Sequence, residues 1–171
     1  MEKGYVQVYT GNGKGKTTAA LGLSLRAVCA GKKVYFAQFV KGMRYSELDA
    51  EKYLPGITIK QYGRDCFIYN EPTAEDIEAA EKGLEECEKV LASGDYDLVV
   101  LDEINIALYY KLFPVERVLT MLDRRHEKTE VVLTGRYAPQ ELIDRADLVT
   151  EMREIKHYYN KGVPAREGIE K

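Results

Sequence analysis

The chain has 171 residues, with 25 Lys or Arg against 28 Asp or Glu, so its formal net charge is −3. This length favours one hydrophobic core, and we expect residues 1–171 to form a single domain. A slightly acidic chain has no overall positive field, so we predict neither nucleic acid nor a membrane surface as a partner. No apolar run approaches the roughly 20 residues that span a bilayer, and no charged-then-apolar leader opens the chain, so we expect a cytoplasmic protein.

In chain order, the first half alternates apolar runs of strand length with patterns of helical spacing. Residues 5–9 are apolar, residues 10–16 are rich in Gly and Lys, and residues 17–30 are rich in Ala and Leu and end at Gly31. This order predicts a strand, a loop and a helix that glycine ends. We then expect a strand, a short helix and a strand, at residues 33–39, 46–54 and 57–62.

The second half begins with the longest predicted helix. Asp76 follows Thr73 by three residues, as in a capping box, and apolar residues then recur at helical spacing. The apolar stripe consists of Ile77, Ala80, Leu84, Cys87 and Leu91. Residues 98–101 are almost uninterruptedly apolar, which is typical of a central parallel strand buried on both faces. Helices at residues 115–125 and 139–146 and strands at residues 131–134 and 148–155 complete the pattern.

Strands that alternate with helices predict an α/β fold with a mostly parallel central sheet and helices on both faces. No internal repeat or Pro/Gly/Ser linker divides the chain. In open α/β sheets, ligands bind beyond the carboxyl ends of the strands. We therefore expect a second-substrate site among the irregular segments at residues 40–45, 63–72 and from 156 onward.

A Gly/Lys-rich loop lies between the first predicted strand and the first predicted helix, where backbone N–H groups wrap a polyphosphate. Glycine there adopts positive φ and lets the backbone approach an anion closely. Lys16 is expected to neutralise phosphate charge, and the Thr17 hydroxyl to bind magnesium. Such loops usually begin with a glycine at the position that Thr10 occupies here, so this loop is a variant. The predicted ATP-binding residues are Thr10, Gly11, Asn12, Gly13, Lys14, Gly15, Lys16, Thr17 and Thr18.

Asp102 and Glu103 end the apolar run at residues 98–101. Such an acidic strand end accompanies a phosphate loop and places carboxylates beside the metal ion. We predict Thr17 and Glu103 as metal ligands, and Asp102 as their hydrogen-bond partner or as an alternate ligand.

Motifs along nearly the whole chain, taken together, resemble the P-loop type ATP:cob(I)alamin (corrinoid) adenosyltransferase family. The shared segments are T-G-N-G-K-G-K-T-T at residues 10–18, Q-F-V-K-G at 38–42, V-V-L-D-E at 99–103, L-T-G-R at 133–136, and the tail from His157-Tyr158 to Gly168-Ile169-Glu170. The phosphate loop and the tail are the more specific of these. In the tail, Lys171 stands where the family often has an aromatic residue.

The resemblance implies a RecA-like P-loop fold, a homodimer, Mg²⁺ or Mn²⁺, and transfer of the 5′-deoxyadenosyl group of ATP to a reduced corrinoid. It also implies an electron donor, such as a flavoprotein reductase. The family's Phe-x-Trp pair near the corrinoid resembles Phe67-Ile68-Tyr69 here, with Tyr replacing Trp. Phe67 and Tyr69 are therefore expected to shield the lower face of the corrin ring, with the alternative that they pack beneath their own loop.

In that reaction cobalt(I) attacks the ribose 5′ carbon, and the intact triphosphate leaves. No protein nucleophile or general base is needed, so the enzyme aligns two reactants and stabilises the departing charge. Lys16 and Glu103 are the residues that we expect to be catalytic. Lys14 adds positive charge, and Lys41 and Arg136 are expected to contact ATP from neighbouring strand ends, although both have the alternative of being solvated loop charges.

Two other functions share the loop and the acidic strand. A small P-loop kinase moves the γ-phosphoryl group and releases ADP, but no Arg-rich lid segment is found. A RecA-like nucleotide-gated binding module acts on DNA or a protein, but the chain has no basic stripe.

The histidines and cysteines lack the spacing of metal ligands. His126 and His157 are expected to be surface or hydrogen-bonded groups. We expect Cys29, Cys66 and Cys87 to be reduced thiols.

Overall fold

A computed structural model of the chain describes residues 2–64, 68 and 70–171. Its centre is a sheet of six parallel strands in the order β3-β2-β4-β5-β1-β6. The strands are β1 (Val6–Thr10), β2 (Val34–Phe39), β3 (Ile57–Tyr62), β4 (Leu98–Asp102), β5 (Glu130–Thr134) and β6 (Leu148–Glu151). The fold is therefore α/β with a RecA-like P-loop arrangement, and every pairing in this sheet is parallel.

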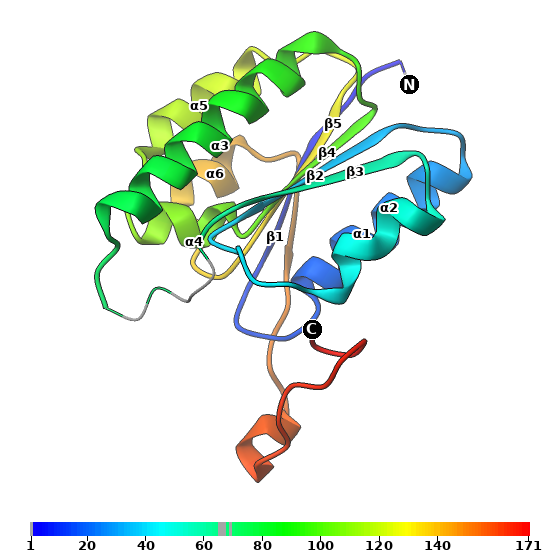
Figure 1. The fold of residues 1–171 in the computed structure, drawn as a ribbon. Helices are drawn as coiled ribbons and strands as arrows, with labels where there is room; N and C mark the ends of the chain where they lie inside the picture. The colour runs from blue at the N-terminus through cyan, green and yellow to red at the C-terminus, as the bar shows by residue number, and fades with distance from the viewer. Residues whose placement is uncertain (1, 65–67, 69) are drawn as a thin grey trace.

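Helices cover both faces of the sheet (Figure 1). Helices α1 and α2 lie on one face, and α3, α4, α5 and α6 lie on the other. The α-helices are α1 (Lys16–Cys29), α2 (Ala50–Tyr53), α3 (Ala74–Ser93), α4 (Ile104–Tyr109), α5 (Val115–Asp123) and α6 (Gln140–Arg145), and the 3-10 helices are η1 (Ser46–Asp49) and η2 (Tyr158–Lys161). None of the described helices is both long and apolar enough to cross a membrane.

Each face of the sheet has its own hydrophobic core. The larger cluster joins the strands to α3 and α5 through side chains such as Phe39, Leu84 and Leu122, and the smaller one packs α1 against Phe36 and Val100. Every residue of the central strands β2 and β4 is buried, which confirms the prediction of a central strand with two covered faces.

The capping box of α3 is confirmed. The Thr73 hydroxyl accepts from the Asp76 backbone N–H at 3.3 Å, and an Asp76 oxygen accepts from the Thr73 N–H at 2.8 Å. The predicted apolar stripe is buried except at Ile77, which is 39% exposed. Ile77 lies in the first turn of α3, which begins at Ala74.

Two sequence predictions were wrong in extent, and one short helix was missed. The predicted helix at residues 46–54 is two short segments, η1 and α2. The predicted strand at residues 148–155 ends at Glu151, because the next carbonyl, that of Met152, accepts from the Gly13 N–H at 2.8 Å and turns toward the loop after β1. Helix α4 was not predicted, because six residues are too few to show a helical period.

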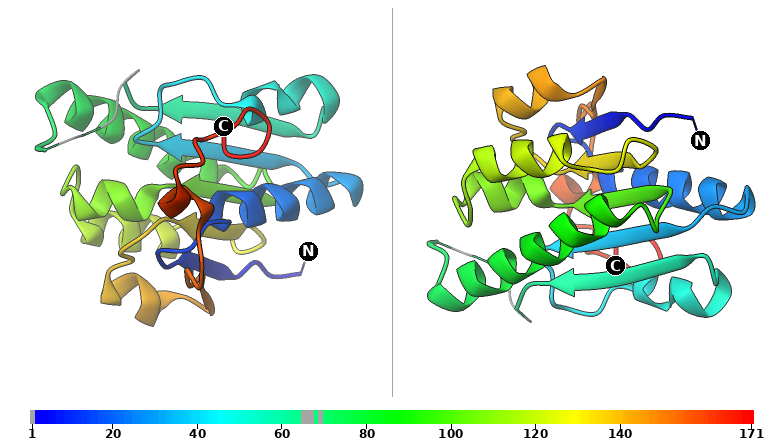
Figure 2. Two further views of the ribbon diagram at one scale, coloured as in Figure 1. Left: turned by 90° about the horizontal axis from the view of Figure 1, so that it is seen from below. Right: turned by 90° about the horizontal axis from the view of Figure 1, so that it is seen from above.

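After β6 the chain crosses the carboxyl edge of the sheet. We call residues 152–171 the strap. Seen from below in Figure 2 (left), the strap runs from β6 across the end of the sheet toward the β2 and β3 side. It therefore lies where α/β proteins bind ligands.

Candidate active site

The predicted phosphate loop joins β1 to α1, as the sequence indicated. Gly15 precedes the first residue of α1 with φ of +115°, a conformation that glycine adopts without a Cβ penalty. No side chain caps α1, and its first turn holds no acidic residue. The N–H groups that begin α1 are thus available to an anion.

The structure explains why residues 11 and 13 are glycines, which the sequence alone did not. A Cβ on Gly11 would lie 2.3 Å from the Met152 carbonyl oxygen, and a Cβ on Gly13 would lie 2.8 Å from it. Glycine is required at both positions because the strap backbone packs directly on the loop. Of the three glycines, Gly15 has only the Met152 sulfur near its Cβ position, at 3.4 Å.

Lys16 is the first residue of α1 and is 8% exposed. Its ammonium donates to the Gly13 carbonyl at 2.7 Å, which holds the side chain against the loop. Burial lowers the pKa of Lys16, and the nearby Arg136 adds to this effect, while Glu103 and Asp102 oppose it. Lys16 is thus a partly desolvated cation, which interacts strongly with an anion at the loop.

Asp102 is fully buried at the end of β4 and accepts three hydrogen bonds. One carboxylate oxygen accepts from the Thr17 hydroxyl at 2.8 Å and from the Thr134 hydroxyl at 2.7 Å. The other oxygen accepts from the Lys41 ammonium at 2.8 Å. Because the Thr17 hydrogen points to Asp102, the lone pairs of that hydroxyl are free to face a cation. This arrangement favours the role of hydrogen-bond partner for Asp102.

Glu103 differs from Asp102 although it is the next residue. It has φ of +60°, its N–H donates to the Thr134 hydroxyl at 3.0 Å, and its side chain lines the cavity. Within the described part of the chain, its carboxylate accepts no hydrogen bond. Burial, followed by the charge of Asp102, raises the pKa of Glu103 against the opposing effect of Lys41, Lys16 and Arg136. An uncommitted, partly desolvated carboxylate of this kind favours a cation beside it.

The arrangement fits a magnesium ion. The Thr17 hydroxyl and the Glu103 carboxylate, which we predicted as metal ligands, both line the cavity beside the phosphate loop. Among the described residues, no three His, Cys, Asp or Glu side chains gather as a metal site. A bound Mg²⁺ would thus complete its coordination with phosphate oxygens and water, as it usually does in nucleotide sites.

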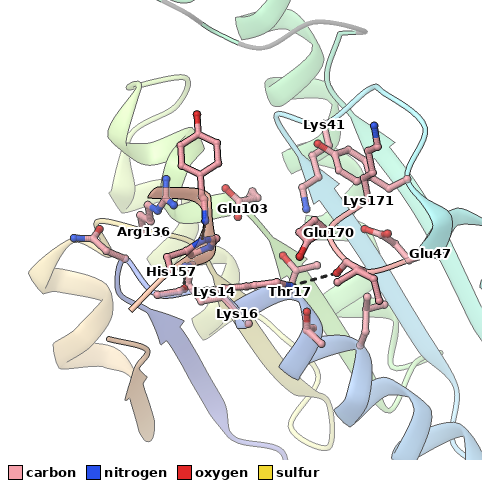
Figure 3. A pocket seen from close by; sticks show the side chains of 18 of the residues that line it. Lys14, Lys16, Thr17, Lys41, Glu47, Glu103, Arg136, His157, Glu170 and Lys171 are labelled. Carbon is pink, nitrogen blue, oxygen red and sulfur yellow. Dashed lines mark hydrogen bonds between the residues drawn. The ribbon is translucent and has the colours of Figure 1, made fainter. Parts of the chain in front are cut away.

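A cavity of about 820 Å³ lies over these groups, and its volume falls in the usual range of ligand pockets. Figure 3 shows side chains from the loop, the strand ends and the strap pointing into it. Of the predicted residues, seven from the loop and three from elsewhere line the cavity, namely Asn12, Gly13, Lys14, Gly15, Lys16, Thr17, Thr18, Lys41, Glu103 and Arg136.

Not every predicted residue is free to contact a ligand in this cavity. Thr10 and Gly11 are outside the cavity lining, and the Thr10 hydroxyl accepts from the Ala138 N–H at 3.3 Å. Lys41 lines the cavity, but its charge is paired with Asp102. Phe67 and Tyr69, predicted at the corrinoid, are outside the described residues, and so is Cys66.

Several residues that line the cavity were not singled out from the sequence as ATP-binding residues, although some lie in the segments where we expected a second-substrate site. They come from the segment before α2, from α4 and from the strap, and include Tyr45, Ser46, Glu47, Ile106, His157, Tyr159, Asn160, Ile169 and Glu170. The signal for the strap residues was present, because the tail carried part of the family resemblance. No local sequence pattern indicated that the tail folds back over the phosphate loop.

The fold and the loop together define an α/β P-loop protein with its site at the carboxyl edge of a parallel sheet. Residues 2–170 match the family ATP:corrinoid adenosyltransferase BtuR/CobO/CobP. The chain therefore belongs to this family, as the sequence motifs predicted.

Curated relatives carry the same description. A corrinoid adenosyltransferase of Sinorhizobium sp is 38% identical over 99% of this chain and 81% of its own length. One from Escherichia coli (strain K12) is 36% identical over 99% of this chain and 86% of its own. Corrinoid adenosyltransferase CobA of Salmonella typhimurium is 34% identical, with the same two coverages.

Proposed function

We propose that this chain transfers the 5′-deoxyadenosyl group of ATP to the cobalt of a reduced corrinoid and releases triphosphate. Family membership over nearly the whole chain is the observation that carries this proposal. The cavity supports it, because Lys16, Arg136 and the N–H groups of the loop surround a space suited to a polyphosphate. Transfer to cobalt needs no protein nucleophile, only alignment and charge stabilisation.

Each side chain then has a defined task. Lys16 and Arg136 stabilise the negative charge on the departing triphosphate, and Lys14 adds a cation at the cavity edge. Thr17 and Glu103 hold magnesium or manganese, which neutralises charge on the phosphate oxygens when bound. Asp102 orients Thr17 and keeps Lys41 in place through its three hydrogen bonds.

A further part of the proposal concerns the direction of ATP in the site. The first glycine of the loop comes one residue late, with Thr10 at the usual position. We propose that the loop holds the phosphates in reversed order, with the γ-phosphate near the position that an α-phosphate normally takes. The ribose 5′ carbon is then exposed to cobalt, and no γ–β bond is polarised. A bound ATP analogue in the ordinary direction, or brisk release of ADP and phosphate without corrinoid, would contradict this orientation.

The resemblance alone carries three more expectations: a homodimer, an external reductase as electron donor, and contact of Phe67 and Tyr69 with the corrin ring. A cytoplasmic location is a fourth expectation, and it was drawn from the sequence pattern. None of the four rests on a described contact.

The direct test is product analysis after incubation with ATP, Mg²⁺ and chemically reduced cobalamin. Chromatography is expected to show adenosylcobalamin and triphosphate in equal amounts. ADP with no adenosylated product would indicate the small P-loop kinase instead.

A further inference from the structure

The strap forms one wall of the nucleotide cavity and is anchored at both sides. At its start, the Met152 backbone packs on Gly11 and Gly13. At its other end, the Ile169 carbonyl accepts from the Lys14 ammonium at 3.3 Å, and the Lys171 carbonyl accepts from the Ser46 hydroxyl at 2.9 Å. The strap thus bridges the phosphate loop and η1, and four side chains between its anchors line the cavity, namely Glu154, His157, Tyr159 and Asn160.

Contacts within the strap fix its shape. The Glu170 carboxylate accepts from the Tyr158 hydroxyl, and from the Arg166 backbone N–H at 2.9 Å and guanidinium at 3.2 Å. These donors hold the pKa of Glu170 at about 2, so the bonds persist across the neutral range. His157 lies next to this network, because its ring contacts that of Tyr158 with centroids 4.9 Å apart.

The orientation of the His157 ring is set by a backbone contact. Its Nδ1 accepts from the Tyr159 N–H at 2.9 Å, which makes His157 the residue that caps η2. A nitrogen that accepts a hydrogen bond carries no hydrogen, so the neutral ring has its hydrogen on Nε2. Nε2 is then a donor and has no free lone pair, so this tautomer cannot ligate cobalt or magnesium through Nε2.

The residues that line the cavity with His157 indicate which kind of ligand its Nε2–H can bind. Lys14, Lys16 and Arg136 line the same cavity, and none of the three forms an ion pair with a described carboxylate. In Figure 3, His157 lies on the same side of the cavity as Arg136, and the Lys14 side chain extends from there across the cavity floor toward Ile169. A donor among unpaired cations is suited to an anionic ligand.

We propose that His157 is a triphosphate-binding residue whose Nε2–H donates to a phosphate oxygen, while its Nδ1 keeps η2 capped. The inference rests on the proposed function, because that function supplies the triphosphate. It adds a contact from the strap to those from the loop. The strap thus binds the substrate directly, in addition to forming one wall of the cavity.

Two substitutions of His157 test the contributions of its two ring nitrogens separately. In His157→Asn, the side-chain oxygen takes the place of Nδ1 and keeps the cap, but nothing reaches the position of Nε2. In His157→Gln, the amide nitrogen takes the place of Nε2 and keeps the donor, but the cap is lost. A purely structural role for His157 predicts that Gln is the more harmful change, and the proposed role predicts that Asn is.

The experiment measures the dissociation constants of Mg-ATP and of inorganic triphosphate by titration calorimetry, without corrinoid. For His157→Asn we expect binding weaker by about 10- to 100-fold, as for a lost hydrogen bond to a charged group. For His157→Gln we expect a smaller loss. Thermal unfolding of each variant checks that the fold is retained.

His126→Asn is the matched control. The His126 ring also accepts a backbone N–H two residues later, that of Lys128 at 3.3 Å, but His126 precedes β5 and does not line the cavity. Its substitution is expected to leave triphosphate binding unchanged.

Lys16→Ala separates the inference from the proposed function. If Lys16→Ala loses triphosphate binding while His157→Asn binds as tightly as the unmodified chain, or no more weakly than His157→Gln, the inference about His157 is wrong and the loop assignment stands. If Lys16→Ala also binds normally, the proposed nucleotide site itself is wrong.

Discussion

Asp102 and Glu103 are consecutive residues at the end of β4, but their carboxylates have different surroundings. Asp102 is buried and accepts from Thr17, Thr134 and Lys41, whereas the Glu103 carboxylate faces the cavity. The sequence already favoured Glu103 as the metal ligand, but from motif resemblance and residue order alone. The contacts support this proposal without testing it, because a carboxylate saturated with three donors has little left to offer a metal ion.

Lys16→Ala is expected to abolish turnover and leave the fold intact. The ammonium is 8% exposed and lies at the loop, so its loss removes a desolvated cation from the departing triphosphate. Oxyanion-type precedent places the cost at about 3 kcal/mol or more in transition-state stabilisation. Single-turnover rates, with circular dichroism as the check on folding, measure the effect. A variant with near-normal rates would remove Lys16 from catalysis.

Glu103→Gln and Asp102→Asn are expected to fail in different ways. Glu103→Gln removes an anionic ligand, so the Mg²⁺ concentration for half-maximal activity is expected to rise by about 10-fold or more. Asp102→Asn leaves the Lys41 ammonium, only 15% exposed, without its carboxylate, so we expect the free energy of unfolding to fall by roughly 3–5 kcal/mol. Metal titrations and urea denaturation of both variants separate these effects. If Asp102→Asn shows the greater change in metal requirement, the two roles are exchanged.

At the scale of elements, the sequence predicts best where a local rule and the tertiary environment agree. The start of α3 was predicted from Thr73 and Asp76, and the structure contains both bonds of the capping box. Helix α1 was predicted from an Ala/Leu-rich run that ends at Gly31, and the loop before it from its Gly and Lys residues. The end of β6 and the path of the strap were not predictable, because they depend on a contact between Met152 and Gly13, which are far apart in the sequence.

Thr73→Ala is expected to lower the free energy of unfolding by about 1 kcal/mol, the usual cost of a lost N-cap. Urea denaturation with an unchanged m-value measures it. A loss below a few tenths of a kcal/mol would show that the cap contributes little to this fold.

Asp76→Asn tests the same cap through pH. Burial raises the pKa of Asp76, but the bonds from Arg64 and Thr73 outweigh this effect and leave it below its ordinary value. The stabilisation is thus fully present above the unfolded pKa, about 3.9, and is lost as the pH falls through the folded pKa. The difference in unfolding free energy between the two proteins is expected to stay constant above pH ~4 and to shrink below it. A difference that grows on acidification would contradict the assigned sign.

Two helical glycines are expected to respond oppositely to alanine. In α3, a Cβ on Gly83 would lie 2.5 Å from the Tyr62 ring, so Gly83→Ala is expected to destabilise by roughly 1–3 kcal/mol despite better helix propensity. In α1, Gly22 has nothing within 4 Å of its Cβ position, so Gly22→Ala is expected to stabilise by about 0.5–1 kcal/mol. Thermal and urea unfolding of the pair checks this. Changes of the same sign would contradict the packing argument.

At the scale of the whole molecule, the parallel sheet brings distant segments to one edge. The loop after β1, the ends of β4 and β5, and the strap all line one cavity, although they span most of the chain. The sequence predicted the loop and the acidic strand, because both have local motifs. It placed the segments of Tyr45 and His157 at a second-substrate site, but it could not predict that they line the same cavity as the phosphate loop, nor that Ile106 does, because the sheet order and the return of the strap bring them there.

The most direct test of the central claim follows both ends of one ATP molecule. ATP labelled with tritium at the ribose 5′ carbon and with ³²P at the γ-phosphate is incubated with the protein, Mg²⁺ and chemically reduced cobalamin. The account predicts that tritium appears on the corrinoid and that ³²P appears in intact triphosphate, one for one. Tritium that remains in ADP, with ³²P on an acceptor or in free phosphate, would contradict it.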